Sequence, residues 1–389
     1  MRVPAAVKNY INSRTHQLVL TNLFMASTIP TVAKAWRFPP TDPSSWDSYH
    51  SLELRDVKVP TPGKGQVLVR MRAVALNARV IMLDIKISLG QYPGGPFTTG
   101  PDNGGLIPTS DGAGEIVAIG EGVNEWTIGD RVHSLFSESW ASGPVRGEYW
   151  PTVIGSHNQG CLTQYRMFPA DFCMPVPEHL SYEEAASITC AGITAFNALF
   201  EYSSITQSST VLVLGSGGVS VYGAQLAKAA GARVIATTSS EDKVLKYKEL
   251  GVDHVINYRD TPNWAAEVQK LTGGQGVDHV FEIGGQGTLM EAVRSIKPGG
   301  VVHLISVPHA SASDVSIHEL AITLLLKQGK LNGVATGGKD IAQRLDGFIT
   351  KHKIKPVLDP KLFGWEEAKE AFEYLNSGAH FGKVVIKID

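Results

Sequence analysis

The sequence predicts two domains: an all-β domain and an α/β domain built on a doubly wound parallel sheet. Three observations lead to this fold class. The chain of 389 residues exceeds the size of one ordinary core. Its first half carries short apolar runs bounded by glycine. Its second half alternates strand-like runs with helical stretches, which is typical of β–α–β units and parallel sheets.

The strands expected in the first half are short runs that alternate apolar and polar residues or lie between glycines. They cover residues 66–76, 114–119, 129–136 and 162–168. Helical patterns are sparse before residue 182, so these strands indicate a small barrel or sandwich. Residues 361–389 contain an amphipathic helix and a strand, and we expect this tail to complete the β domain.

The second half predicts strands at residues 210–215, 233–238, 254–258, 278–283 and 301–307, joined by helices. Gly231 and Gly251 follow two of these helices, where a helix C-cap favours a residue of left-handed conformation. The predicted division is an N-terminal extension over residues 1–30, a β domain over 31–180 and 345–389, and an α/β domain over 181–344.

The composition excludes several classes of partner. The formal net charge of −2 gives no general attraction to nucleic acid or to an anionic membrane. No apolar run approaches eighteen residues, so no membrane span is expected. The three cysteines, Cys161, Cys173 and Cys190, are too few and too scattered for a disulfide framework. A cytoplasmic protein is therefore expected.

The N-terminal residues leave a second location open. Residues 1–41 contain five basic residues and no Asp or Glu. If residues 1–24 are a transit peptide, the protein is mitochondrial. The alternative is an irregular extension before a start at Met25.

A glycine-rich loop follows the first strand of the α/β half and opens a helix. Its residues are Gly215, Ser216, Gly217, Gly218, Val219 and Ser220. The first glycine permits a tight turn, the second lets the backbone approach a pyrophosphate, and the helix N-terminus supplies free N–H groups. Ser220 stands at the usual third glycine and is small enough for close helix–strand packing. The motif predicts a dinucleotide site formed by Gly215 to Val219.

The residues after the second strand predict NADP(H) as the cofactor. An NAD site places an acid there for the ribose hydroxyls, but residues 236–240 contain none. Ser239, Lys243 and Tyr258 offer two hydroxyls and an ammonium, which suit a 2′-phosphate. For Lys243 alone, the alternative is a solvated helix residue.

Five sequence blocks together resemble the medium-chain dehydrogenase/reductase superfamily, in particular its zinc-free quinone-oxidoreductase-like branch, over residues 33–389. The blocks are SDGAGEIVAIGEGV with GDRV (110–132), AASITCAGITAFNAL (185–199), VLVLGSGGVS (211–220), GVDHVINY (251–258) and FGKVVI (381–386). The resemblance implies a GroES-like β-barrel catalytic domain, closed by the C-terminal tail, and a Rossmann cofactor domain. This agrees with the fold class read from the patterns.

The resemblance also implies that no zinc is bound. Zinc enzymes of the superfamily place a Cys, a His-Glu pair and a second Cys around a catalytic metal. Here the first position falls within residues 76–80, which contain no Cys, and the His-Glu position reads Ser110-Asp111. Only Cys190 lies near a ligand position, and one thiolate does not make a three-ligand site. We expect Cys190 to pack beside the cofactor cleft as a small apolar residue.

The resemblance assigns roles to further residues. Asn77 is expected beside the nicotinamide, Thr194 at the nicotinamide amide and Lys383 on the cofactor side. Similar sequences often have Asp where Val80 stands, so a proton-delivery role of that Asp does not carry over. The course of the cofactor across the sheet adds Gly284 and Val307, which lie at the ends of later strands.

The predicted activity is the NADPH-dependent reduction of a quinone, an enone or a related carbonyl. Without a Lewis acid, a conjugated and therefore activated acceptor is easier to reduce. A proton or hydrogen bond for the acceptor oxygen is expected from Tyr92, Asn77 or water. The alternatives are a zinc-free alcohol dehydrogenase and, in a different class, a nucleotide-binding protein of low turnover with a structural or regulatory role.

The small hydrophobic substrate is expected in a cleft between the two domains. Trp140, Tyr149 and Trp150 lie within residues 139–158, and this loop either walls the cleft or is a packed or subunit-contact loop. A homodimer is expected because the apolar segments between Val301 and Val334 end the parallel sheet, and an open edge strand favours pairing with its twin.

Overall fold

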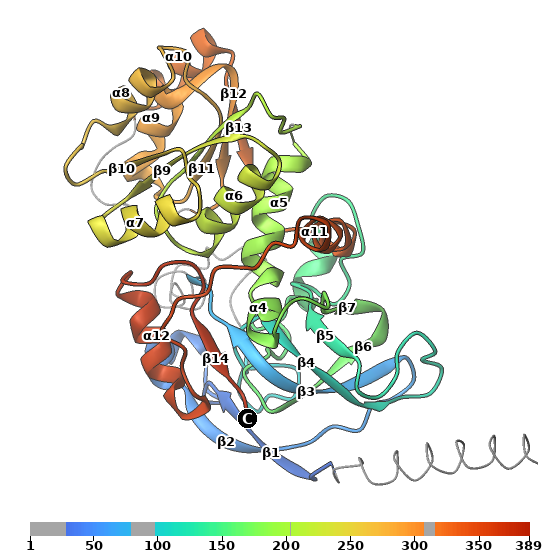
Figure 1. Cartoon of the computed structure of the whole chain (residues 1–389). Helices are drawn as coiled ribbons and strands as arrows, with labels where there is room; N and C mark the ends of the chain where they lie inside the picture. The colour runs from blue at the N-terminus through green and yellow to red at the C-terminus, as the bar shows by residue number, and fades with distance from the viewer. Residues whose placement is uncertain (1–28, 79–97, 203, 307–315) are drawn as a thin grey trace, which may run out of the picture.

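The computed structural model describes residues 29–78, 98–202, 204–306 and 316–389. Two sheets of six strands dominate the described part of the chain, and a pair of strands flanks one of them. In Figure 1, the parallel sheet and its helices lie above the antiparallel sheet, and a helical run passes between the two. The described helices include none long and apolar enough to cross a membrane.

The upper sheet is entirely parallel, with strand order β10-β9-β8-β11-β12-β13. Its order reverses between β8 and β11, which is the switch point where doubly wound sheets bind ligands. The predicted fold class is confirmed here. The strands are β8 (Thr210–Val213), β9 (Arg233–Thr238), β10 (His254–Asn257), β11 (Val277–Glu282), β12 (Ile296–Leu304) and β13 (Lys330–Gly333).

Both faces of this sheet are covered by helices, because alternate strand residues point to opposite faces. In β8, Val211 and Val213 join one buried cluster, whereas Leu212 joins another. The first cluster includes α5 (Ile193–Phe200), α6 (Gly218–Ala229), α7 (Glu241–Glu249) and α11 (Lys339–His352). The second includes α8 (Trp264–Leu271), α9 (Gln286–Ser295) and α10 (Ile317–Lys327).

Gly231 and Gly251 follow α6 and α7 with φ of +85° and +75°, as their C-cap positions require. The strand predicted at residues 301–307 was placed too late. The observed strand β12 begins at Ile296 and ends at Leu304, because the stretch from Ile296 to Gly300 is extended although it contains Pro298 and two glycines.

The antiparallel sheet has the order β14-β3-β4-β5-β7, with β6 also paired to β3. The C-terminal strand β14 pairs with β3, so the tail completes the β domain, as predicted. The bounds are β1 (Val32–Arg37), β2 (Glu53–Lys58), β3 (Gln66–Ala75), β4 (Asp111–Ile119), β5 (Arg131–Ser134), β6 (Tyr165–Pro169), β7 (Cys173–Pro175), α12 (Ala368–Asn376) and β14 (Val385–Lys387).

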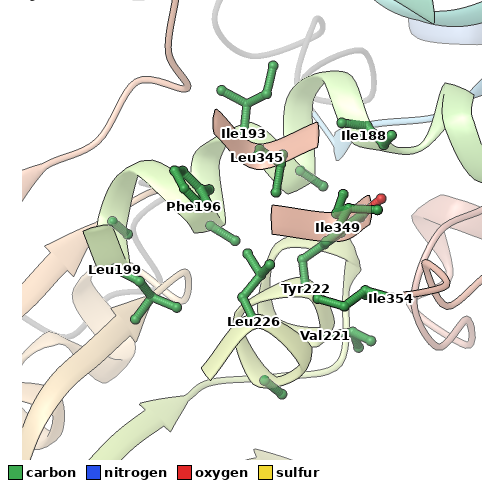
Figure 2. Close-up of a cluster of buried hydrophobic side chains, with 14 of the residues drawn as sticks. Ile188, Ile193, Phe196, Leu199, Val221, Tyr222, Leu226, Leu345, Ile349 and Ile354 are labelled. Carbon is green, nitrogen blue, oxygen red and sulfur yellow. The ribbon is translucent and has the colours of Figure 1, made fainter. Parts of the chain in front are cut away.

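A buried apolar cluster joins the two parts of the chain. The helical run of α4 (Tyr182–Ala186), the π-helix η5 (Ile188–Gly192) and α5 leads from the antiparallel sheet to the parallel sheet. Figure 2 shows Ile193 and Phe196 of α5, Tyr222 and Leu226 of α6, and Leu345 and Ile349 of α11 in one cluster. Helix α11 spans the boundary expected between residues 344 and 345, and the domain division stays a prediction.

One buried ion pair also crosses between these parts. His133 of β5 lies 3.1 Å from the Asp346 carboxylate of α11 through its Nε2. Its Nδ1 lies 3.1 Å from the carbonyl oxygen of Ser134. Both ring nitrogens face acceptors, an arrangement that favours the protonated imidazole, which donates from both nitrogens. Burial alone would lower the pKa of His133, but the Asp346 carboxylate and the Ser134 carbonyl outweigh burial and raise it.

This ion pair predicts that the free energy of unfolding falls as the pH rises above about 6.5. Because the folded-state pKa of His133 is raised, its contribution is complete below about pH 6.5, the unfolded value, and is lost as the pH rises through the folded pKa. Asp346→Asn should lower the free energy of unfolding at pH 6 by about 3 kcal/mol. Without the Asp346 carboxylate, burial lowers the folded-state pKa of His133 below its unfolded value. The free energy of unfolding of this variant should therefore rise as the pH approaches about 6.5.

Urea unfolding of both proteins between pH 5.5 and 9 measures these slopes. Lys228 and Asp253 form a half-exposed pair, and Asp253→Asn serves as the control for loss of one carboxylate. Equal pH slopes in wild type and Asp346→Asn would contradict the assignment.

Candidate functional site

The glycine-rich loop lies at the carboxyl end of β8, beside the switch point of the parallel sheet. Gly215 has a φ of +70°, a conformation that favours glycine. Gly217 is the N-cap of α6 and provides no side-chain cap, so no side chain occupies the first N–H groups of the helix. Ser220 donates to the Leu214 carbonyl and thereby fastens α6 to the preceding strand. These features fit the diphosphate of a dinucleotide.

The C-terminal tail crosses directly over this loop. The backbone N–H of Gly382 donates to the Ser216 carbonyl at 3.0 Å, and Gly217 forms a bridge with Gly382. A Cβ on Gly218 would lie 2.5 Å from Cδ of Lys383, whereas a Cβ on Gly217 would lie 3.8 Å from Nε2 of His380. Gly218 is therefore required by the passage of the tail, and Gly217 keeps the approach to the helix N-terminus open.

Beyond the loop, the ammonium of Lys383 lies in a buried polar group. We name this group, formed by Leu76, Asn77, Asp111 and Lys383, the Lys383 cluster. The ammonium donates to the Leu76 carbonyl at 2.8 Å, to Oδ1 of Asn77 at 2.7 Å and to Oδ2 of Asp111 at 3.2 Å. Lys383 is 2% exposed and Asp111 is fully buried. The stem of Lys383 thus lies against Gly218 of the glycine-rich loop, while its ammonium lies in this buried polar group.

Asp111 also holds the π-helix that carries Cys190. Oδ2 of Asp111 accepts from the backbone N–H of Cys190 at 3.3 Å, and Oδ1 accepts from the Ser110 hydroxyl at 2.5 Å. Thr194, one turn later, donates to the Cys190 carbonyl. The structure therefore brings Asn77, Cys190, Lys383 and Thr194 into one connected group, which is where the resemblance places the nicotinamide.

The three residues expected at the 2′-phosphate lie at the far end of the site. Tyr258 follows β10 opposite the end of β9, and its N–H donates to the Thr238 carbonyl at 3.0 Å, next to Ser239. Lys243 is only 8% exposed and donates to the Gly378 carbonyl, so it is not a solvated helix residue. Burial lowers the pKa of Lys243, as do the positive charges of Lys246 and Arg259. This end of the site is basic.

Gly284 lies at the carboxyl end of β11 and is fixed by the preceding strand. Its N–H and that of Gly285 donate to Oε1 of Glu282, which also accepts from the Thr288 hydroxyl. A Cβ on Gly284 would lie 2.3 Å from Oγ1 of Thr288, so a larger residue does not fit. Burial raises the pKa of Glu282, against the lowering effect of these hydrogen bonds.

The aromatic residues of the 139–158 loop are packed. Trp140 and Tyr149 stack with ring centroids 5.7 Å apart, and both are buried. The Trp140 carbonyl accepts from the N–H of Lys339 at the start of α11. Of the two roles left open for this loop, the structure shows packing against α11; Trp150 and His157 are half-buried.

Some predicted residues lie outside the described part of the chain, namely Tyr92, Val80 and Val307. Conversely, no local pattern in the sequence indicated three other residues of this region. Asp111 holds Lys383, and His380 lies against Gly217, with its pKa lowered to about 4 chiefly by burial and by Lys243. Thr336 takes a φ of +56°, which is unfavourable for a β-branched residue, while Asn197 of α5 donates to its carbonyl.

The residues present do not fit a catalytic zinc. Cys190 is half-buried, Ser110 stands at one ligand position, and the Asp111 carboxylate is paired with an ammonium. Within residues 29–78, 98–202, 204–306 and 316–389, no three His, Cys, Asp or Glu side chains are placed to hold a metal ion.

Comparison with known families gives two matches. Residues 63–178 match the alcohol dehydrogenase GroES-like domain, and residues 218–351 match the zinc-binding dehydrogenase family. These matches cover all strands of the antiparallel sheet except β14 and all strands of the parallel sheet except β8, respectively. They confirm the predicted pairing of a GroES-like and a Rossmann domain.

Individual proteins agree with the families. The chain is 35% identical over 344 residues to a zinc-type alcohol dehydrogenase-like protein of Schizosaccharomyces pombe, covering 88% of this chain and 96% of the relative. It is 30% identical to 2-methylene-furan-3-one reductase of Solanum lycopersicum, covering 96% and 84%. The crystal structure of a putative alcohol dehydrogenase from Sinorhizobium meliloti superposes with a TM-score of 0.81 at 32% identity, covering 93% and 100%.

Substitutions of Gly217 and Gly218 should have different effects, one on dinucleotide binding and the other on stability. Gly218→Ala should lower the free energy of unfolding by about 1–3 kcal/mol, because the new methyl group overlaps the stem of Lys383. Gly217→Ala should cost less than about 1 kcal/mol, since its Cβ meets only an ordinary contact. It should nevertheless weaken dinucleotide binding at least about tenfold, because the methyl group faces the expected diphosphate.

Thermal unfolding of the free protein and titration with dinucleotide separate the two effects. A Gly217→Ala variant that binds the dinucleotide like wild type would refute the placement of the diphosphate.

Proposed function

The chain belongs to the medium-chain dehydrogenase/reductase superfamily as an NAD(P)H-dependent oxidoreductase, and on this premise we propose that it is a zinc-independent, NADPH-dependent reductase of a quinone, an enone or a related conjugated carbonyl. One observation carries this proposal: the buried Asp111 carboxylate is bound by the Lys383 ammonium at 3.2 Å, at the position where zinc enzymes of the superfamily have a ligand pair.

The donor set at this position argues against zinc. A catalytic zinc needs three protein ligands, usually from Cys, His, Asp or Glu. Ser110 and Asp111 stand where the His-Glu pair is expected, and both oxygens of Asp111 already accept hydrogen bonds. Cys190 alone remains, so polarisation of the substrate falls to hydrogen-bond donors. The zinc in the names of the family and of the yeast relative is a property of those proteins.

The basic end of the site supports NADPH as the cofactor. Lys243 is held in place by the Gly378 carbonyl, with the positive charges of Lys246 and Arg259 near it. Ser239 and Tyr258 follow two neighbouring parallel strands. A 2′-phosphate would neutralise these charges, whereas the two ribose hydroxyls of NADH would not.

The substrate class follows from the lack of a Lewis acid. Bound nicotinamide supplies the hydride, and the chain supplies position and hydrogen bonds. Conjugated acceptors need less polarisation than isolated carbonyls. The name of the tomato relative, 2-methylene-furan-3-one reductase, describes the reduction of such a conjugated ketone. The names of the yeast and bacterial relatives refer to alcohol dehydrogenases. The alternative for this chain is therefore an alcohol dehydrogenase, which on the donor set described above would work without zinc.

Oxidation of NADPH by the purified full-length chain tests the proposal. The acceptors are a panel of quinones, enones and saturated aldehydes, each assayed with and without a chelator, and the metal content is measured by elemental analysis. We expect turnover with the conjugated acceptors, no effect of the chelator and no stoichiometric zinc. Turnover confined to alcohols or saturated aldehydes, or activity lost with the chelator, would refute the proposal.

The preference for NADPH is expected to depend on Lys243. Lys243→Ala should weaken NADPH binding by about 1.5–3 kcal/mol, the value of hydrogen bonds to charged groups, and should leave NADH binding nearly unchanged. Fluorescence titration of both cofactors measures this. Lys246→Ala, one helical turn away, is the control for general charge, and its smaller effect should be screened by salt. An unchanged preference in Lys243→Ala would contradict the assignment.

We also propose a homodimer formed along the edge of the parallel sheet. Strand β13 is one edge of this sheet, and helix α10, which packs on the neighbouring strand β12, has no buried residue. Ile317, Leu325 and Leu326 of α10 are 81%, 74% and 74% exposed, an apolar face that a second copy would cover.

Light scattering should therefore give twice the chain mass of 41.8 kDa. Leu325→Glu together with Leu326→Glu should yield the monomer, whereas Ile128→Glu, an equally exposed apolar site on the β domain, should not. A wild-type monomer at micromolar concentration would refute the dimer.

A cytoplasmic location is proposed from the cysteines. Cys161 and Cys173 are buried free thiols, which is usual in a reducing compartment. Residues 1–24, which bear on the mitochondrial alternative, lie outside the described residues.

A further inference from the structure

The three hydrogen bonds of the Lys383 ammonium determine how the Asn77 side chain is oriented. An ammonium has three donors and no acceptor. All three donors are used within the Lys383 cluster, by Leu76, Asn77 and Asp111. The amide atom of Asn77 that faces Lys383 must therefore be its oxygen, and the amide nitrogen must point away from the ammonium.

The amide nitrogen of Asn77, Nδ2, has no hydrogen-bond partner among the described residues. It is also shielded from solvent. An unpaired buried amide costs about 1–3 kcal/mol, so a donor in this state calls for an acceptor from outside the chain. Thr194 and Cys190 connect to the same cluster through Asp111, which places this donor on the side where the nicotinamide is expected.

Asp111 is the part of the cluster that keeps Lys383 in this role. It is fully buried and contributes the only carboxylate bound to Lys383 among the described residues. Without that carboxylate the ammonium would be an unpaired buried charge, which is strongly unfavourable. A neutral amine would carry a lone pair and could accept from Nδ2 of Asn77, so the amide would no longer have a single orientation.

From this geometry we infer that Asp111 is a positioning residue: through Lys383 it holds the Asn77 amide so that Nδ2 donates a hydrogen bond to the carbonyl oxygen of the bound substrate. Asp111 itself touches no substrate. The inference rests on the proposed function, because it assigns the donor that takes the place of a Lewis acid for a conjugated carbonyl. Negative charge that develops on this oxygen during hydride transfer would strengthen the hydrogen bond.

A double-mutant cycle on the full-length protein tests the inference. Asn77→Ala should lower kcat by about 100-fold, the size of the loss of one donor to a developing oxyanion. Asp111→Asn should lower kcat by about tenfold, and NADPH affinity should change by less than about threefold, because Asp111 is not a ligand contact. In the Asn77→Ala background, Asp111→Asn should lower kcat no further, because the group it positions is gone.

Two further variants separate positioning from folding. Lys383→Arg retains a cation that only donates and should keep more activity than Lys383→Met, which cannot orient the amide. Glu138→Gln breaks another buried carboxylate–cation pair of the β domain, with Arg166, and is the matched control for loss of stability; kcat should stay within about twofold of wild type. Thermal unfolding of each variant shows that it is folded.

A second readout does not depend on turnover. The emission of bound NADPH reports the surroundings of the nicotinamide, and it should shift in Asp111→Asn and Asn77→Ala but not in Glu138→Gln. If the wild-type protein reduces no conjugated carbonyl, the proposed function is wrong. The emission of bound NADPH in the variants then tests by itself whether Asp111 positions Asn77. Equal loss of kcat from Asp111→Asn in both backgrounds, or an emission shift equal to that of the control, would overturn it.

Discussion

The ion pair between Lys383 and Asp111 connects the four segments that carry Asn77, Asp111, Cys190 and Lys383. Lys383 belongs to the C-terminal tail, Asp111 begins β4, Leu76 and Asn77 follow β3, and the Cys190 N–H belongs to the π-helix. A buried charge pair is tolerated only when its remaining hydrogen bonds are satisfied. Here each donor of the ammonium has an acceptor, so the tail, two strand ends and a helix are held in one arrangement.

This constraint explains the shape of the glycine-rich loop. For Lys383 to reach Asp111, the tail must cross the start of α6, and Gly382 pairs with Ser216 and Gly217 as it does so. Gly218 leaves room for the lysine stem, and Gly217 leaves room for the diphosphate. Gly218 is thus constrained by the packing of the tail, and Gly217 by the expected cofactor. The glycine-rich motif therefore has a structural role in addition to its expected role in cofactor binding.

The sequence predicted those parts of the molecule that local patterns encode. The strand–loop–helix unit at Gly215 to Ser220, the C-caps at Gly231 and Gly251, and the return of the tail to the β domain are confirmed. Asp111 and Lys383 are 272 residues apart, and no local pattern indicates that they meet. The burial of Lys243 depends on the Gly378 carbonyl, which is 135 residues away in the sequence. The extended stretch at the start of β12 contradicts the propensity of its proline and glycines.

The residues at the position of the zinc-ligand pair are hydrogen-bonded to one another and to the rest of the chain. At the position of the His-Glu pair, Ser110 donates to Asp111 instead of offering an imidazole, and Asp111 turns its other oxygen to Lys383 and to the Cys190 N–H. The acceptors that a metal would need are thus consumed by internal hydrogen bonds. What remains toward the cofactor is a donor, the Asn77 amide, whose direction follows from the chemistry of its lysine partner. Under the proposed function, this directed hydrogen bond takes the role that a Lewis acid has in the zinc enzymes, and it suits acceptors that conjugation has already activated.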